Sequence, residues 1–485
     1  MSGKTAAATS YRGSDKLVLG IVLAVVTFWL FAQTTLNIAS TMRADLRISE
    51  SLNNISVSIT ALFSGIFIVV AGGLADRVGR MKITYAGLVL SILGSLLIAI
   101  SPTGTAVFLM AGRIIQGLSA ACIMPATLAL LKAYFEGAAR QRAISFWSIG
   151  SWGGSGLCSL FGGLIASSLG WRWIFWMSIV VAIISLLLIR GTPESKEAGT
   201  RDAPFDWPGL IAFIIAMIAL NVIIGQGSSL GWTSLALLAL IGTFVVASVI
   251  FFRVELSKSN SFVDLTLFKN KTFAGATLSN FLLNGAAGTL IVALALVQQA
   301  AGLSSLQSGL LTAGYLVAIL STIRVGEKLL QKMGARKPML YGCIITAVGI
   351  LLTCGTFLLT WQYLTVAFIG FTLFGIGLGF YATPSTDAAL SNVPPDKSGS
   401  ASGLYKMASS LGAAFGVAIS AAIFSALSQG GSQSAPFPEL FLGRTDNVTV
   451  RFAAAIGLLF NVALAVIAAI AVIVTVPKDD PRSRS

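Results

Sequence analysis

The chain has 485 residues, 55% of them hydrophobic and only 10% charged, which is more apolar surface than a water-soluble fold can bury. Its net charge of +14 is not gathered into basic runs of the kind found in nucleic-acid-binding segments, so we expect no nucleic-acid partner. The absence of histidine excludes histidine-based metal, triad and proton-shuttle chemistry, and we expect no metal, no cofactor and no enzymatic activity.

Long apolar runs without alternation predict helices that cross a lipid bilayer, because a helix satisfies its backbone polar groups internally and needs about 20 residues to span the hydrocarbon. Fourteen such runs follow one another, which puts both chain ends on the same side of the membrane. The expected spans are 17–41, 55–73, 84–101, 106–131, 143–168, 173–189, 207–226, 234–252, 272–299, 306–323, 338–359, 361–391, 399–428 and 452–476.

Lys and Arg are unequally divided between the two sets of loops. The terminal segments and the even-numbered loops hold 25 of the 32, the odd-numbered loops hold five, and Arg113 and Lys406 lie inside spans. Because basic residues gather on the cytoplasmic side of membrane proteins, we expect both termini in the cytoplasm of a multi-pass plasma-membrane protein. The partner of its surface is then the lipid bilayer.

A weak internal repeat divides the chain into two halves. Residues 76–82 after the second span are echoed by 331–337 after the tenth, and Pro125-Ala-Thr lines up with Pro384-Ser-Thr. Repeats of this kind place a substrate near the membrane midplane, between two bundles that rock against each other. We expect a cytoplasmic tail over 1–16, a six-helix bundle over 17–190, a linker with two additional helices over 191–271, a second six-helix bundle over 272–476 and a cytoplasmic tail over 477–485.

Residues 72–82 read G-G-L-A-D-R-V-G-R-M-K and resemble the loop signature of the major facilitator superfamily. Other segments are similar to further motifs of that superfamily and of its 14-span drug:proton antiporter branch: 113–117, 170–176, 262–268 and 399–403. The resemblance implies an all-α integral membrane fold of two pseudo-symmetric six-helix bundles plus two extra helices. It also implies export of drugs or other amphiphilic small molecules, by proton antiport with alternating access, and we expect a monomer.

By the same resemblance, Asp76 should lie near the start of the thirteenth span, at residues 398–400, where the free N–H groups and dipole of a helix favour a carboxylate. The contact would close an inner gate between the bundles. The alternative is a turn that only satisfies the basic-inside topology. The echo at 331–337 lacks the acid, so we expect the contact on one side only. The expected gate residues are Gly72, Asp76, Arg77, Gly79 and Arg80.

The chain departs from the antiporter pattern in two places. Ala32 stands where the first span usually carries an acid, and residues 158–163 of the fifth span lack the Gly-Pro of the antiport motif. Charges inside spans are costly and mark functional positions. We expect Asp387 and Lys406 to be close enough to pair, either as a switch or as a permanent ion pair, and Arg113 could be functional or a static anchor. The proton-coupling candidates are Asp387, Arg113, Lys406, Glu50 and Glu327.

Aromatic and polar side chains within the spans predict a cavity suited to amphiphilic molecules of varied shape. Without the acid of the first span this cavity is neutral to positive, which favours neutral, zwitterionic or anionic substrates over lipophilic cations. Two other functions stay open: a dedicated exporter of one metabolite or lipid-like compound, and a membrane scaffold or sensor without transport. The expected cavity residues are Trp29, Gln33, Asn37, Gln116, Met124, Trp147, Trp152, Asn280, Phe281, Asn284, Gln298 and Tyr381.

Overall fold

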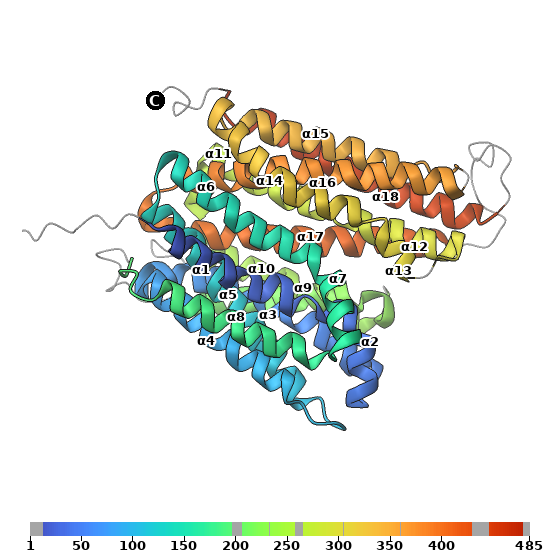
Figure 1. Cartoon of the computed structure of the whole chain (residues 1–485), viewed down its shortest axis with the longest axis horizontal. Coiled ribbons are helices and arrows are strands. Elements are labelled where there is room, and N and C mark those ends of the chain that lie inside the picture. Colours follow the sequence, from blue (N-terminus) through green and yellow to red (C-terminus); the bar gives the residue numbers. More distant parts are fainter. Residues whose placement is uncertain are drawn as a thin grey trace, which may run out of the picture.

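A computed structural model of the chain describes residues 13–195, 206–231, 233–257, 265–303, 305–358, 360–428 and 446–478, and these form helices and their connecting turns (Figure 1). The α-helices are α1 (Asp15–Val26), α2 (Thr35–Leu46), α3 (Glu50–Val78), α4 (Arg80–Ala99), α5 (Val107–Tyr134), α6 (Gly137–Ser148), α7 (Gly154–Ser168), α8 (Arg172–Ile189), α9 (Trp207–Leu230), α10 (Leu235–Ser257), α11 (Lys271–Gly285), α12 (Gly288–Ala301), α13 (Ser305–Leu310), α14 (Ala313–Met333), α15 (Arg336–Thr353), α16 (Thr360–Ser391), α17 (Ser398–Ser428) and α18 (Val448–Thr475).

Within the described residues, twelve helical stretches are long and apolar enough to cross a membrane, and a bent pair over 137–168 makes a thirteenth if it counts as one span. The predicted seventh span corresponds to α9, whose apolar stretch Trp207–Leu220 is shorter. The chain is therefore an all-helical, multi-span membrane protein. The count of fourteen spans stays a prediction.

The helices fall into two groups and a separate pair. α1–α8 pack mainly on one another, and so do α11–α18. In Figure 1 the two groups lie close together at the left, where α17 begins, and diverge at the right toward α2 and α12. α9 and α10 pair with each other, and α9 also contacts α3 and α17, so the extra pair lies along the seam between the groups. The residue bounds given for the two bundles and the linker from the sequence remain predictions.

Two breaks in helical geometry face each other in the first group. The π-helical turn η1 (Thr27–Ala32) follows α1, and the π-helical turn η2 (Ile149–Gly153) joins α6 to α7. The turns are in contact, and a Cβ placed on Gly154 would lie 3.1 Å from the Cβ of Trp29. π-Helical turns of this kind are frequent at functional sites. The sequence pattern predicted continuous helices here.

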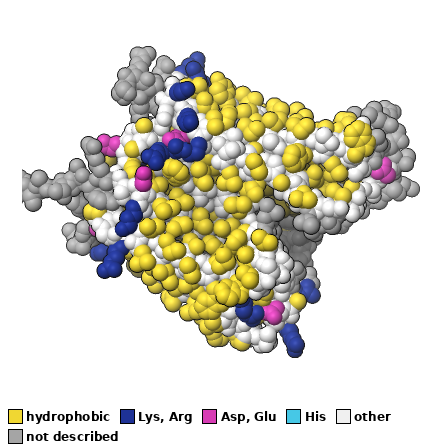
Figure 2. Space-filling model, in the orientation of Figure 1, with side chains coloured by type: hydrophobic (Ala, Val, Ile, Leu, Met, Phe, Trp, Pro, Cys, Tyr) yellow, Lys and Arg dark blue, Asp and Glu magenta, His cyan; other side chains and the backbone are white. Residues whose placement is uncertain are grey.

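The surface fits a lipid environment. Figure 2 shows hydrophobic side chains covering the broad middle of the visible face, with Lys and Arg concentrated toward its ends. The side chains of Leu235 and Val246 on α10 are 84% and 60% exposed, as lipid contact requires. We call the end at which α3, α5 and α16 finish and α4, α6 and α17 begin the basic end.

Candidate functional site

Asp76, near the end of α3, binds the first turn of α17. Its Oδ1 accepts a hydrogen bond from the backbone N–H of Gly399 at 2.9 Å, and its Oδ2 accepts one from Ser400 at 3.0 Å. These N–H groups have no partner within their own helix, and the helix dipole adds to their attraction for an anion. The sequence predicted this position. The contact joins the two groups of helices at the basic end, and we call it the Asp76 clasp.

Arg80, one turn after Asp76, completes the clasp. Its Nε and Nη2 donate to Asp76 Oδ1 at 3.1 and 2.9 Å, and Nη2 also donates to the carbonyl oxygen of Pro395 at 2.7 Å. Both side chains are buried, with the two residues 4% exposed. A buried ion pair is expensive to break by removing one partner, because the other charge is left uncompensated. Arg77, on the same turn of α3, is half-buried.

Two glycines of the signature are required by geometry. A Cβ on Gly72 would lie 2.5 Å from the carbonyl oxygen of Gly399, so only glycine lets α3 and α17 approach this closely. Gly79 has φ +132°, a conformation that favours glycine, and turns the chain from α3 into α4. The Glu194 carboxylate then accepts hydrogen bonds from the N–H groups of Met81 and Lys82 and so caps α4.

A second clasp joins α6 to α16 at the same end. Arg140 donates through Nε to Asp387 Oδ1 at 3.3 Å and through Nη2 to Ser391 Oγ at 2.7 Å, and Ser391 Oγ donates to Asp387 Oδ1 at 3.0 Å. Lys132 at the end of α5 donates to the carbonyl oxygen of Val393. The expectation of a one-sided contact was therefore wrong, because the second acid comes from α16 rather than from the echo at 331–337.

The predicted pairing of Asp387 with Lys406 is also wrong in this structure. The Lys406 Nζ lies 4.2 Å from the centroid of the Trp147 ring and 5.6 Å from that of Tyr405. Asp387 instead faces Arg140 across the boundary between the groups. Sequence spacing gave the depth of both residues but not their direction around the helix axis, and Arg140 was counted only as a loop charge.

Arg113 is held by backbone oxygens. It is 1% exposed, and its Nη1 donates to the Ala32 carbonyl at 2.7 Å and to Gln116 Oε1 at 2.9 Å, while its Nε donates to the Ser56 carbonyl at 2.9 Å. Gln116 Nε2 in turn donates a hydrogen bond to Ser95 Oγ at 3.3 Å. The position that carries an acid in the antiporter pattern thus supplies a carbonyl oxygen. This arrangement favours the static anchor among the alternatives for Arg113.

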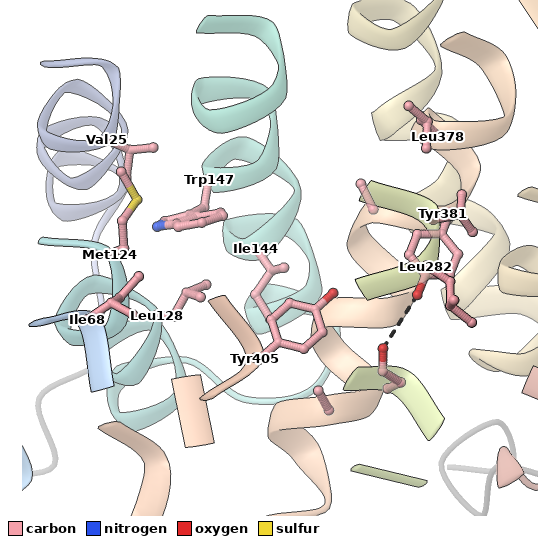
Figure 3. Close-up of a cluster of buried hydrophobic side chains, with 14 of the residues drawn as sticks. Val25, Ile68, Met124, Leu128, Ile144, Trp147, Leu282, Leu378, Tyr381 and Tyr405 are labelled. Carbon is pink, nitrogen blue, oxygen red and sulfur yellow. Dashed lines mark hydrogen bonds between the residues drawn. The ribbon is translucent and has the colours of Figure 1, made fainter. Parts of the chain in front are cut away.

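Among the predicted cavity residues, Met124 and Trp147 lie where α5, α6 and α17 meet. Figure 3 shows Met124, Trp147, Ile144 and Tyr405 in succession across this region. Trp147 is fully buried and its Nε1 donates to Thr127 Oγ1 at 3.0 Å. Trp29 in η1 is partly buried, and its Nε1 has no hydrogen-bond partner in the described structure.

Other predicted cavity residues are bound within their own group of helices. Asn280 Nδ2 donates to the Tyr405 carbonyl at 3.0 Å and Asn284 Nδ2 to Asn280 Oδ1 at 2.9 Å, while Tyr381 shares a 2.6 Å hydrogen bond with Ser279. Gln298 is exposed at the far end of α12, bonded to Ser308. Gln33, Trp152 and Phe281 are partly buried.

The two remaining acids among the coupling candidates differ in what the structure describes. Glu327 is 3% exposed in α14, pairs with Arg324 of its own helix and accepts a hydrogen bond from Gln331 at 3.1 Å. It therefore lies inside a longer helix than the predicted span, and its described ion pair and hydrogen bond are both made within that helix. The side chains of Glu50 and of the cavity residue Asn37 lie outside the described structure.

The segment 170–176 fastens the opposite end of the first group. Asp45 Oδ2 accepts hydrogen bonds from Arg172 and, at 3.0 Å, from Trp171 Nε1, and Arg172 also donates to the Ser101 carbonyl at 2.9 Å. The hydrogen bond from Arg172 lowers the pKa of Asp45 below its usual range. All four residues belong to one group, so this cluster holds α2, α8 and their neighbouring loop together and does not bridge the groups.

Comparison with known proteins identifies the class. The sequence pattern of the Major Facilitator Superfamily matches residues 17–417 and 276–485. The chain belongs to this superfamily. It is 53% identical over 419 residues to the Quinolone resistance protein NorB of Staphylococcus aureus (strain MRSA252), covering 86% of this chain and 90% of the relative. It is 49% identical over 471 residues to the same-named protein of strain COL, covering 97% and 98%.

Solved structures share the fold at low sequence identity. The proton:xylose symporter XylE bound to 6-bromo-6-deoxy-D-glucose superposes with a TM-score of 0.66 at 16% identity and 95% coverage of both chains. The human organic anion transporter MFSD10 gives a TM-score of 0.58 at 15% identity, covering 93% of this chain and 98% of that one. Both are similar to this chain in fold.

Proposed function

We propose that the chain is a secondary active transporter of the plasma membrane that exports drugs and other amphiphilic small molecules in exchange for protons. The observation that carries the proposal is that the two groups of helices are joined at the basic end by clasps of single side chains. Such contacts can break and reform while each group stays intact, which is what alternating access between two rigid bundles requires.

The distribution of basic residues indicates which end of the molecule faces the cytoplasm. The excess of Lys and Arg in the termini and even-numbered loops assigns the basic end to the cytoplasm. The clasps are then an inner gate, and this conformation is closed toward the cytoplasm. Gly72, Asp76, Gly79 and Arg80 serve the gate directly. The transporter works as a monomer in this proposal, since each bundle of one chain supplies half of both clasps.

Proton coupling is assigned to Asp387. It is the acid that bridges the bundles from within a span, and it is 1% exposed. Protonation would remove the charge that Arg140 binds, and so would favour opening toward the cytoplasm. Release of the proton there would restore the ion pair and help the gate to close.

The cargo follows from the relatives. Two of the relatives are named for quinolone resistance and are about half identical over most of the chain. An exporter dedicated to one metabolite or lipid-like compound is the second candidate, favoured by the missing acid at Ala32. A scaffold or sensor without transport is disfavoured, because such a protein has no need for charged gates between its halves.

Everted membrane vesicles containing the chain test the proposal. With an acidic lumen, we expect uptake of a zwitterionic fluoroquinolone in preference to the cation ethidium, and we expect uptake to stop when a protonophore collapses the gradient. Vesicles without the chain are the control. Absence of gradient-driven uptake of any drug, with the protein inserted, would refute drug export. Uptake of a single compound class would favour the dedicated exporter.

A further inference from the structure

Lys406 is a buried cation whose ammonium group has no polar acceptor among the residues that the structure describes. It lies in α17 about two turns from the Asp76 clasp and is 6% exposed. Within the described parts of the chain, no group accepts a hydrogen bond from its Nζ and no carboxylate oxygen lies within 4.0 Å of it. A buried charge normally has a counter-ion, because desolvation is costly without one.

The polar groups of the aromatic residues around Lys406 form hydrogen bonds with other partners. The Trp147 indole N–H is bound to Thr127, and the Tyr405 hydroxyl lies 2.8 Å from Ser385 Oγ. Asp387, the acid of α16, is bound by Arg140. The ring faces alone attract the ammonium, and the hydrogen bonds at the ring edges hold those faces in place.

The pair also lies across the boundary between the bundles. Trp147 belongs to α6 and Lys406 to α17, so each bundle contributes one member (Figure 3 shows Trp147 and Tyr405 with Ile144 between them). When the bundles move, the two side chains separate or close on whatever lies between them. A ligand with a carboxylate beside an aromatic ring meets both members at once: the carboxylate takes the free N–H groups of Lys406, and the ring takes the face of Trp147.

We propose that Lys406 and Trp147 form the recognition site for an aromatic carboxylate, so that the chain selects anionic or zwitterionic aromatic substrates. The inference rests on the proposed transport function and names its substrate class. It adds a residue, Lys406, to a cavity that sequence patterns had lined with neutral side chains.

Equilibrium binding to the purified full-length protein tests the site without transport. The probes are ciprofloxacin, which carries an aromatic carboxylate, and its methyl ester. We expect the wild type to bind the acid at least tenfold more tightly than the ester. Lys406→Gln should abolish that preference by weakening acid binding about tenfold, and Lys406→Arg should keep it. Trp147→Leu should weaken both probes, and Lys337→Gln, an exposed lysine at the start of α15, should change neither.

Equal wild-type affinity for acid and ester would overturn the site, whether or not any variant folds. So would a Lys406→Gln protein whose affinities for acid and ester fall by the same factor, so that the preference for the acid is kept, since that would make Lys406 a structural residue. Acid-selective binding without gradient-driven uptake would leave the site standing and refute the transport proposal. Gradient-driven ethidium uptake, together with binding that shows no preference for the acid, would refute the site and leave the transport proposal standing.

Discussion

At the scale of single residues, Asp76 shows how hydrogen bonds satisfy a carboxylate that is buried near the apolar interior. Two backbone N–H groups and Arg80 supply all of its described partners. Asp76→Asn keeps the shape but loses the charge and one acceptor. Since hydrogen bonds to charged groups contribute about 1.5–3 kcal/mol, the closed state should lose roughly a factor of ten to a hundred in population.

Maleimide labelling measures this loss. Ser402 is fully buried just inside the clasp, and Ser402→Cys, in a background without the native cysteines, should label slowly when Asp76 is present. With Asp76→Asn the labelling rate should rise at least tenfold. Asp45→Asn removes a hydrogen-bonded carboxylate whose partners lie within one bundle, and it should leave the rate unchanged. Equal rates in all three proteins would count against the clasp.

The residue scale also marks the limit of sequence reasoning. The Asp76 contact could be predicted because a helix N-terminus attracts carboxylates and the motif resemblance brings α3 to α17. The hydrogen-bond partners of Asp387 and Arg113 could not be predicted from the sequence. Their bonds depend on how each helix is rotated about its axis, and the carbonyl of Ala32 is freed for Arg113 where the chain forms a π-helical turn.

At the scale of elements, the approach of α3 to α17 depends on Gly72. Gly72→Ala would push a methyl group into the backbone of α17, and overpacking of this kind costs about 1–3 kcal/mol. The closed gate should weaken and gradient-driven drug uptake should fall, by tenfold or more. Gly65→Ala on the same helix is the matched control, because a Cβ there has nothing within 4 Å. Similar uptake by the two variants would show that the close approach is not needed.

The element pattern was largely predictable, since each predicted span overlaps a helix of the structure. The breaks were not. The turn η1 sits in an apolar stretch that reads as a continuous helix, and η2 lies in a Gly/Ser-rich stretch that permits a break without specifying its form. Both turns are maintained by tertiary contacts such as those of Arg113 and Gly154. Propensity gives way to packing at such positions.

At the scale of the whole molecule, coupling requires that one protonation event changes how the bundles meet. Asp387→Asn should therefore uncouple transport: drug should still move down its own gradient, but an imposed pH gradient should no longer drive uptake. Glu327→Gln is the control, because the described partners of Glu327 lie on its own helix. Undiminished pH-driven uptake by Asp387→Asn would refute the assignment.

The central claim is that the two bundles part at the basic end when the clasps break. Spin labels in place of Lys82 and Lys337, exposed residues at the starts of α4 and α15, report the separation of the bundles by double electron–electron resonance. The account predicts one short distance in the otherwise unaltered protein and a second, longer distance when Asp76→Asn and Arg140→Gln are combined. An identical distance distribution in the two proteins would contradict it.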